Sequence, residues 1–384
     1  MGPGNHHRRG ADAAGPMPGV LPPKCQRTRP RAPRAATLAL LAAVAVALVA
    51  CPAARAARLS AEAIRQAADY SGATGEVALI IWQNGSVRLQ RESDWLRQRQ
   101  GMHDVRSITK SMWALALLAA AEQGRVRLDD PVAPWLPEWR DDRRGALTFR
   151  QLMQMTSGLD PNAARIYRQG HRDLNHATLA SGQRFEAGRT FRYGPSGPEA
   201  AWLAWQRALA TRGEAPERWF AERTAGATGA APPWWRRDEQ QRPFASAGAR
   251  TRPHDLLQLG IVLVRDGRAQ GPGRRQVLSR ASIDQALRGS AANPAYGFGF
   301  WLNHQAARAD AVELFVEDLL DLDPGEIDWH RVCLSRQAPP ELAVMLGSSG
   351  QRVYLVRSSN LVVVRLGEGK AFRDHEFLAR LFAR

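Results

Sequence analysis

The strand-forming segments of this chain lie at its two ends, which limits the folds open to it. Towards the N-terminus, an Asn84-Gly85 pair, a strong signal for a tight hairpin, separates the β-rich runs Glu76–Trp82 and Ser86–Arg91. Towards the C-terminus, turn-rich segments separate three β-branched runs, which are Leu342–Leu346, Arg352–Val356 and Leu361–Leu366. The sequence therefore predicts one antiparallel sheet assembled from both ends of the chain.

Helical patterns fill the region between these two groups of strands. Apolar residues recur there at helical spacing, and helix-starting residues precede several of the runs. The expected helices are Ser60–Tyr70, Ser107–Gln123, Phe149–Met155, Pro198–Ala210, Pro253–Val264 and Ala281–Leu287. We expect an α/β (α+β) fold, with helices flanking the sheet and a helical subdomain of roughly residues 107–290 inserted between its strands. The Gly226–Arg242 stretch, with its paired prolines and tryptophans, is expected to be an irregular loop.

The N-terminal region has the pattern of a targeting segment. Residues 1–50 carry seven basic residues and one acid and end in the apolar run Ala35–Ala50, which is typical of a signal peptide. The following Cys51 completes a segment similar to the lipobox of bacterial lipoproteins, where the cysteine is acylated. Cleavage after Ala56 and a retained anchor are the alternatives. We expect a signal peptide over 1–50, a lipid on Cys51 and a folded domain over 57–384. The protein would then lie in the cell envelope, periplasmic and lipid-anchored, or otherwise be secreted.

Charge and cysteine content exclude several classes of function. Removing residues 1–50, which carry a net charge of +6, lowers the formal net charge from +16 to +10. The arginines are scattered among acids without a zinc-finger, aromatic-strand or basic-helix signature, so we expect no nucleic-acid partner. The basic exterior could face anionic envelope polymers or simply be solvated. Cys333 is the one cysteine outside the leader and the lipobox, so it has no partner for an internal disulfide, and no cysteine–histidine spacing suggests a metal.

One lysine stands at a position suited to chemistry. Only three of the 53 basic residues are lysines, and Lys110 follows Ser107 by three positions at the head of an apolar helical run. The two side chains therefore share one face of the helix. Arginine stays protonated in proteins, whereas a desolvated lysine can lose its proton and act as a base. We interpret Ser107 as a nucleophile and Lys110 as its base.

Four segments, in the same order along the chain, are similar to segments shared within one enzyme family. They are Arg106–Ser111, Leu147–Leu159, Phe244–Gly248 followed by His254-Asp255-Leu256, and Tyr296–Trp301. Over most of its length after the leader, the chain resembles the serine β-lactamase-like hydrolases, which include class C β-lactamases, esterases, 6-aminohexanoate-dimer hydrolases and D-alanyl-D-alanine carboxypeptidases. The resemblance implies a β-lactamase/transpeptidase-like fold with Ser107 as the nucleophile.

The second catalytic element of that family is a tyrosine followed two positions later by an asparagine. The candidate here is Tyr193, and Pro195 stands in the place of the asparagine. Tyr193 would relay protons beside Lys110, where an ammonium would favour a tyrosinate by opposite charge. Since Pro195 offers no side-chain amide, any substrate contact made there must be lost or moved to Ser196.

The third element in the family is a basic or histidine residue, a small residue and a glycine on an inner strand. Gly347–Gln351 is the aligned segment, which puts Met345 in the place of the cation. Met345 cannot bind a carboxylate, which counts against penicillin-type substrates unless Arg352 or Arg357 compensates. The Gly-x-x-Gly-Gln pattern resembles the amide- and ester-hydrolysing branch. By this resemblance the backbone N–H groups of Ser107 and Ser348 form the oxyanion hole, and Ser196, Gly347, Ser349 and Gln351 contact substrate.

The resemblance implies a serine hydrolase that cleaves an ester or amide bond, in a small molecule or peptide, through an acyl-enzyme on Ser107 and without a metal or cofactor. One alternative is a penicillin-binding-type protein, carboxypeptidase or β-lactamase, that acts on or binds peptidoglycan. Another is a non-catalytic envelope lipoprotein with the same fold. The acid-rich stretch Asp310–Asp328 would either overhang the site and tune specificity or form an exposed acidic helix.

Overall fold

The two ends of the chain meet in one sheet, as the sequence predicts. The structure is a computed structural model and describes residues 58–271, 275–315, 317 and 327–383. Its main sheet has six strands in the order β2-β1-β11-β10-β9-β6. The strands are β1 (Glu76–Gln83), β2 (Ser86–Glu92), β6 (Trp301–Leu302), β9 (Ala343–Gly347), β10 (Gln351–Val356) and β11 (Leu361–Gly367). All neighbours in this sheet are antiparallel, and β1 lies directly against β11, with Gln83 opposite Leu361.

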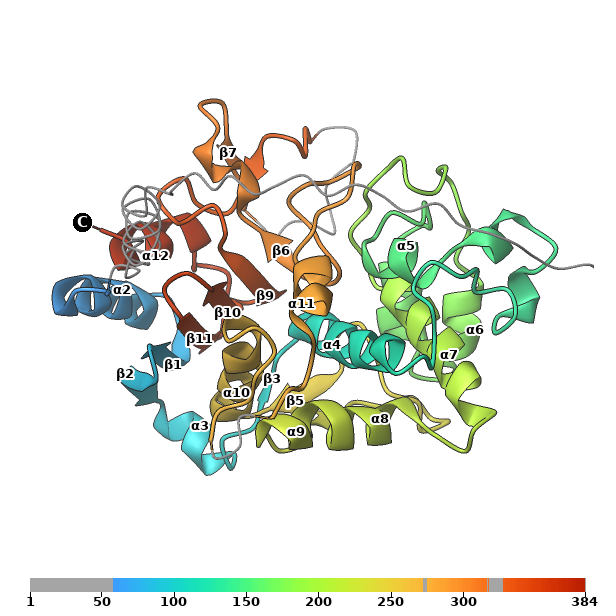
Figure 1. Cartoon of the computed structure of the whole chain (residues 1–384), viewed down its shortest axis with the longest axis horizontal. Coiled ribbons are helices and arrows are strands. Elements are labelled where there is room, and N and C mark those ends of the chain that lie inside the picture. The colour runs from blue at the N-terminus through green and yellow to red at the C-terminus, as the bar shows by residue number, and fades with distance from the viewer. Residues whose placement is uncertain (1–57, 272–274, 316, 318–326, 384) are drawn as a thin grey trace, which may run out of the picture. The chain divides into compact units, whose positions relative to one another are not determined.

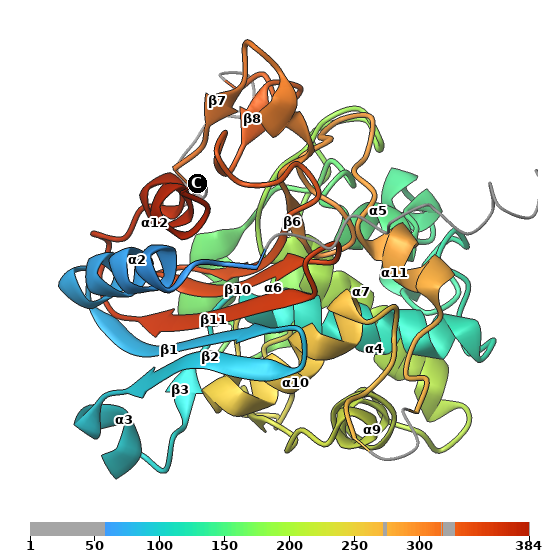
Figure 2. The same ribbon diagram turned by 60° about the vertical axis from the view of Figure 1, so that its left-hand side comes forward.

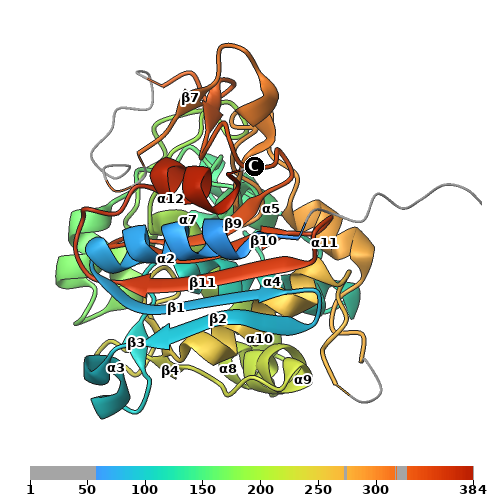
Figure 3. The ribbon, with the colours of Figure 1, turned by 90° about the vertical axis from the view of Figure 1, so that its left-hand side faces the viewer.

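Helices cover both faces of this sheet. The helices are α2 (Ala61–Ala73), α3 (Asp94–Gln98), α4 (Ile108–Glu122), α5 (Phe149–Met153), α6 (Leu174–Leu179), α7 (Ser196–Ala210), α8 (Pro216–Trp219), α9 (Gly226–Thr228), α10 (Pro253–Val264), α11 (Arg280–Ala286) and α12 (Asp374–Leu381). Figures 2 and 3 show α2 and α12 together on one face and α10 on the other. Close contact with α10 depends on Gly260, because a Cβ there would lie 2.6 Å from Val362 Cγ1. The expected α+β class is confirmed.

Helix α4 links the sheet to the helical half of the domain. Figure 1 shows α4 between the sheet strands and the group formed by α5, α6 and α7. Its Trp113 ring stacks on Trp235, with ring centroids 4.4 Å apart, and meets the rings of Trp202, Trp205 and Phe220 edge-on. Such aromatic pairs bury large areas in fixed relative orientations. The start of α4 is therefore held firmly against its neighbours.

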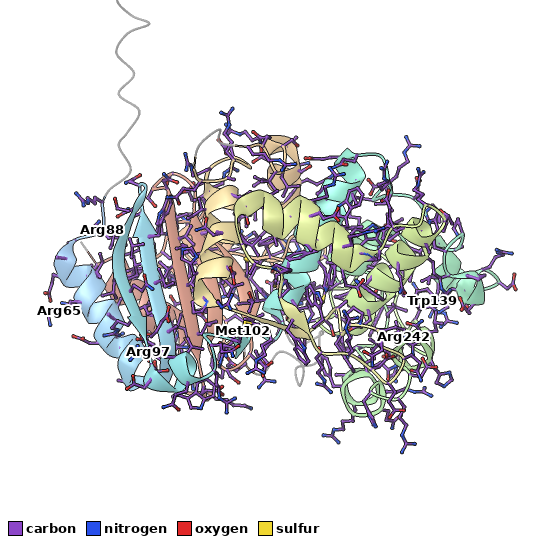
Figure 4. All side chains as sticks on the ribbon, turned by 90° about the horizontal axis from the view of Figure 1, so that it is seen from below. Arg65, Arg88, Arg97, Met102, Trp139 and Arg242 are labelled. Carbon is purple, nitrogen blue, oxygen red and sulfur yellow. The ribbon has the colours of Figure 1, made fainter. Side chains whose placement is uncertain are left out.

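The ends of the domain are polar in both halves. Figure 4, seen from below, places Arg65 on α2 beside the sheet and Arg242 on the side of the helical group. Both arginines are ion-paired to nearby acids, Arg65 to Glu62 and Arg242 to Asp173 and Asp238. The basic residues are thus interspersed with acids in space as they are in the sequence.

Two sequence expectations need adjustment. The Gly226–Arg242 stretch is not wholly irregular, since it contains α9 and the short strand β4 (Trp234–Trp235). Strand β4 pairs with β5 (Ala249–Thr251), which pairs in turn with β3 (His103–Asp104). The tryptophans that suggested a loop form this strand because Trp235 packs on the aromatic cluster of α4. Helix α7 begins at Ser196, two residues before the expected start, because a proline is tolerated within the first turn of a helix.

Candidate active site

Ser107 and Lys110 meet at the start of α4. Ser107 is the residue immediately before the helix, and Lys110 lies one turn further on, so the two side chains point to the same side. Lys110 Nζ is 2.9 Å from Ser107 Oγ. Arg106, just before the serine, has a φ of +52°, an uncommon conformation for a residue with a side chain. This turn brings Ser107 to the partly exposed end of a helix whose interior is buried.

The environment of Lys110 favours a neutral amine. The side chain is 2% exposed, and Nζ also donates a hydrogen bond to the carbonyl oxygen of Ser246, at 2.7 Å. Burial removes the ammonium from water and lowers the pKa of Lys110 to about 7, while the charge of Glu199 opposes this shift. A substantial fraction of Lys110 is therefore unprotonated at neutral pH, as a general base must be.

Tyr193 lies beside this pair. Its ring centroid is 5.1 Å from Lys110 Nζ, and its hydroxyl hydrogen-bonds to Ser107. Two backbone hydrogen bonds to Met155 fix its position, from Arg192 N to the carbonyl oxygen at 2.9 Å and from Gly194 N to Sδ at 3.3 Å. Met155 belongs to the segment Leu147–Leu159, so that segment forms the support under the tyrosine.

The expected tyrosinate is not favoured. Burial raises the pKa of Tyr193 to about 12, and the hydrogen bond to Ser107 only partly offsets this effect. Tyr193 is therefore a neutral phenol near pH 7 and can donate a proton.

The end of β9 lies against the turn that carries the nucleophile. A Cβ on Gly347 would lie 3.1 Å from Ser107 N and 2.4 Å from the carbonyl oxygen of Val105. Within the described residues, the N–H groups of Ser107 and Ser348 donate to no protein acceptor. Unpaired backbone donors on these two neighbouring segments are the groups that an oxyanion hole requires.

The other residues that were expected to contact substrate differ in how accessible their side chains are. Ser196 is 4% exposed at the first position of α7, and Ser349, with a φ of +61°, is half-buried in the turn after β9. Gln351 is turned towards β11, where its amide donates to the carbonyl oxygen of Gly367 at 2.6 Å and accepts from Gly367 N at 3.0 Å. The structure therefore gives Gln351 a role in joining strands, and it brings Gly347 but not the Gln351 amide to the nucleophile.

Neither Arg352 nor Arg357 supplies the cation that was expected at the place of Met345. Met345 is fully buried in the hydrophobic core opposite Val353. Arg352, also fully buried, forms two hydrogen bonds to the carboxylate of Asp374 at 2.7 and 2.8 Å. Arg357 is paired with Asp266 and Asp284. These arginines are already neutralised by acids of the protein.

One acid of the Asp310–Asp328 stretch lies next to the third element. The Glu317 carboxylate accepts hydrogen bonds from Ser349 N at 2.7 Å and Gly350 N at 3.1 Å, and Arg352 lies 3.3 Å away. Residues 316 and 318–326 of this stretch lie outside the described residues. Glu317 is thus neither an exposed helical acid nor free, since its side chain is 2% exposed.

Sequence reasoning missed the buried acid Glu199. Its carboxylate accepts hydrogen bonds from Ala245 N at 3.0 Å, Ser246 N at 2.8 Å and Ser246 Oγ at 2.5 Å. The Phe244–Gly248 segment was noted for its resemblance alone, and the structure shows that it supplies the carbonyl that holds Lys110. The available signal was an acid inside the apolar run Pro198–Trp205, since an unpaired buried carboxylate is costly.

Cys51 and residues 1–57 as a whole lie outside the described residues. Among the helices that are described, none has the length and hydropathy of a membrane span. Over the same residues, no cluster of three or more His, Cys, Asp or Glu side chains is arranged to hold a metal ion.

Cys333 is buried, which raises the pKa of its thiol to about 11 and leaves it unreactive near neutral pH.

A serine and a buried lysine thus meet at the head of a core helix, beside the end of strand β9 of the antiparallel sheet. The family model described as Beta-lactamase matches residues 61–381, and the chain belongs to this family. The predicted recognition and the predicted class of enzyme, a serine hydrolase of this family, are confirmed.

The individual proteins that this chain matches are similar to it over a short stretch only, or at low sequence identity. A stretch of 97 residues is 34% identical to esterase EstB of Burkholderia gladioli, and it covers 22% of this chain and 24% of that esterase. The solved structure of EstCE1, a hydrolase with promiscuous acyltransferase activity, has a TM-score of 0.59 and 18% identity over 84% of this chain and 99% of its own. A D-stereospecific amidohydrolase from Streptomyces has a TM-score of 0.55 and 17% identity, covering 84% and 98% of the two chains. A penicillin-binding protein homologue from Caulobacter crescentus has a TM-score of 0.56 and 15% identity, covering 85% and 97%. At these identities the structures establish the fold only.

Proposed function

We propose that this protein hydrolyses an ester or amide bond of a small, neutral substrate through an acyl-enzyme on Ser107. The observation that carries the proposal is the 2.9 Å contact between Ser107 Oγ and the buried Lys110 Nζ. A lysine whose pKa is lowered to about 7 is a competent base for a serine hydroxyl at that distance.

The reaction would proceed in two acyl-transfer steps. Lys110 takes the hydroxyl proton of Ser107 while Ser107 Oγ forms a bond to the substrate carbonyl carbon. The N–H groups of Ser107 and Ser348 hold the resulting oxyanion. The bond to the leaving group then breaks, Tyr193 passes a proton to the leaving group, and the proton held by Lys110 returns to Tyr193. In the second step, water gives a proton to Lys110 and attacks the acyl carbon. The bond between that carbon and Ser107 Oγ then breaks, Oγ receives a proton back through the same groups, and the acid and free Ser107 are released.

The preference for neutral substrates rests on the surroundings of the third element. The backbone N–H groups of Ser349 and Gly350, which could hold a substrate carboxylate, already bind Glu317. The strand position that carries a cation in the family carries Met345, which is in the core. A substrate carboxylate would therefore meet a negative charge and no unpaired cation here.

The first test is covalent labelling of the nucleophile. A fluorophosphonate probe should label the wild-type protein and fail to label Ser107→Ala. Ser111→Ala is the matched control, because Ser111 lies on the same helix but its hydroxyl donates to the carbonyl oxygen of Gly299. Labelling that persists in Ser107→Ala would reject the assignment. The non-catalytic alternative requires that even the wild-type protein remains unlabelled.

The second test measures substrate preference. kcat/KM for p-nitrophenyl butyrate should exceed that for nitrocefin and for a D-Ala-D-Ala peptide. Glu317→Ala should raise the nitrocefin value by about tenfold, the scale of one charge-assisted hydrogen bond. Glu313→Ala, an acid of the same stretch that instead accepts from Arg336 N, should leave it unchanged. A wild-type preference for nitrocefin would favour the penicillin-binding alternative.

We also propose that the protein is lipid-anchored in the cell envelope through Cys51. The proposal rests on the basic leader, the apolar run and the lipobox-like segment in the sequence. Cells grown with an alkyne fatty acid should yield a labelled protein, and Cys51→Ala should abolish the label. Cleaved, unlabelled wild-type protein would indicate ordinary secretion.

A further inference from the structure

Glu199 is a buried carboxylate that the proposed mechanism does not use. It lies in the first turn of α7, is 2% exposed, and directs its oxygens at the segment before β5. Three hydrogen bonds, from Ala245 N, Ser246 N and the Ser246 hydroxyl, satisfy it. Carboxylates are rarely buried unless they are paired, so a function for Glu199 should be sought among the groups around it.

Ser246 connects Glu199 to the catalytic base. Its N–H and hydroxyl donate to Glu199, and its carbonyl oxygen accepts from Lys110 Nζ at 2.7 Å. The carboxylate therefore fixes the peptide unit that in turn orients the lysine towards Ser107. Tyr167, on the π-helical turn Arg165–Gln169, hydrogen-bonds to the Ser246 side chain and completes this support.

Glu199 is also the charge that acts on Lys110. Among the described residues, it is the one ionisable group whose charge shifts the pKa of Lys110, and it shifts that pKa upwards. The other titratable groups nearby are Tyr193 before α7 and Tyr167, whose pKa values burial raises, so both are neutral near pH 7. The positive charge of Arg236 acts on Tyr167, whose pKa it lowers slightly against the larger effect of burial.

We propose that Glu199 is a positioning residue and the internal counter-ion of Lys110, which stabilises the ammonium formed when Ser107 transfers its proton. This inference rests on the proposed function, because it assigns Lys110 the part of the base. In the step concerned, the Ser107 O–H bond breaks, an N–H bond forms on Lys110, and Oγ bonds to the carbonyl carbon. The positive charge created on Lys110 is balanced by the carboxylate of Glu199, and both side chains are buried.

The small number of lysines allows a direct test. The chain has three, Lys24, Lys110 and Lys370, and Lys370 is exposed. Protein labelled with ¹³C at the lysine Cε positions would give at most three signals, and loss of one in Lys110→Met would assign the buried lysine. Titration of that signal measures the proton affinity of Lys110 without any substrate.

Removing the carboxylate should weaken the lysine as a base. In Glu199→Gln, the Lys110 pKa should fall by about one unit or more relative to the wild type, since an opposite charge no longer favours the ammonium. Ser246→Ala should give a smaller fall, because the lost hydroxyl hydrogen bond leaves Glu199 less ionised. Asp238→Asn is the matched control, a buried carboxylate that accepts from Leu174 N and Arg242 N, and it should leave the titration unchanged. A Lys110 pKa that is unchanged or raised in both variants at the site would overturn the proposal.

A kinetic readout separates this proposal from the proposed function. In wild-type enzyme, kcat/KM for the ester should rise with pH as Lys110 loses its proton. In Glu199→Gln that acidic limb should move to lower pH by the same amount as the titration, while the plateau falls by at least about tenfold. If kcat/KM falls in Glu199→Gln but the acidic limb of its pH profile does not move, Glu199 has a structural role only. Absence of turnover in the wild type would instead reject the proposed function, and the lysine titration would still decide the charge coupling.

Discussion

At the scale of single residues, the site depends on placing ionisable groups where water is excluded. Lys110 and Glu199 are both buried, and burial moves their pKa values in opposite directions, each to about 7. Each group is shifted towards its neutral form by burial, and each partly restores the charge of the other. Desolvation is therefore the main cause of the shifted pKa values of both side chains.

Arginine should not replace Lys110. Lys110→Arg keeps a positive charge and much of the length, but a guanidinium has no accessible neutral form. We expect kcat/KM for p-nitrophenyl butyrate to fall by at least about 10²-fold, the usual contribution of a general base. Lys370→Arg, at an exposed position, should retain full activity. Near-normal rates in Lys110→Arg would show that the lysine is structural.

Removing the lysine should stabilise the protein at low pH. The pKa of Lys110 is about 7 in the folded state and near 10.4 when unfolded, so the unfolded state binds more protons between these values. The resulting penalty is complete below about pH 7 and is lost as the pH rises towards 10. Lys110→Met should thus raise the free energy of unfolding by about 2–4 kcal/mol at pH 6 and by much less at pH 10.

Urea unfolding at both pH values measures this difference. Lys370→Met serves as the control and should change stability by less than about 0.5 kcal/mol at either pH. An equal gain for Lys110→Met at pH 6 and pH 10 would attribute the effect to packing and would argue against a shifted pKa.

At the scale of elements, the family segments support one another around the nucleophile. Helix α5 begins with a capping box between Thr148 and Gln151, which satisfies two backbone donors at its start. The turn that follows holds Tyr193 through Met155. The segment Tyr296–Trp301 packs against α4, where Gly299 accepts a hydrogen bond from Ser111 at 2.5 Å. Ser107, Lys110 and Tyr193 thus lie at or just before the starts of helices, and these neighbouring segments support them.

The contact between β9 and the nucleophile turn should not tolerate a methyl group. In Gly347→Ala, the new Cβ would lie 2.4 Å from the carbonyl oxygen of Val105, and backbone must move to relieve it. We expect kcat/KM to fall by about 10²-fold, since the oxyanion donors on Ser107 and Ser348 would separate. Gly182→Ala is the control, because its nearest neighbour would be 3.9 Å away. Equal activity of the two variants would place the oxyanion hole elsewhere.

At the scale of the whole domain, the sheet joins segments far apart in the sequence. Strand β11 lies between β1 and β10, and buried Arg365 on β11 donates a hydrogen bond to Ser71 Oγ on α2. Long-range pairing of this kind makes the two ends of the domain one cooperative unit. Loss of either end would remove a partner from the centre of the sheet.

Hydrogen exchange should report this unit. The amides of β1 and β11 should belong to the same slowest-exchanging group, although about 280 residues separate them in sequence. Those of edge strand β2, which has exposed positions, should exchange faster. If the amides of β10 and β11 were protected while those of β1 exchanged early, the sheet would not depend on both ends of the domain, and the prediction would be wrong.

Much of the fold was predictable because it depends on local patterns. The strand runs, the Asn84-Gly85 turn and the major helices were found to within a few residues, since period and turn chemistry are properties of short segments. The pair Ser107 and Lys110 was found for the same reason, because one helical turn brings them together. The strand in Gly226–Arg242 was missed, since it exists only through packing of Trp235 on α4.

The sequence alone indicated the family, the order of the main elements and the pairing of Ser107 with Lys110. The tertiary structure decided which groups surround them. Glu199 and Ser246 reach Lys110 from two other segments, Gln351 turns to β11 and away from the nucleophile, and Glu317 binds the N–H groups after β9. These facts depend on long-range contacts and on burial, and burial sets the pKa of a lysine or a carboxylate by removing water, which no local pattern of residues specifies.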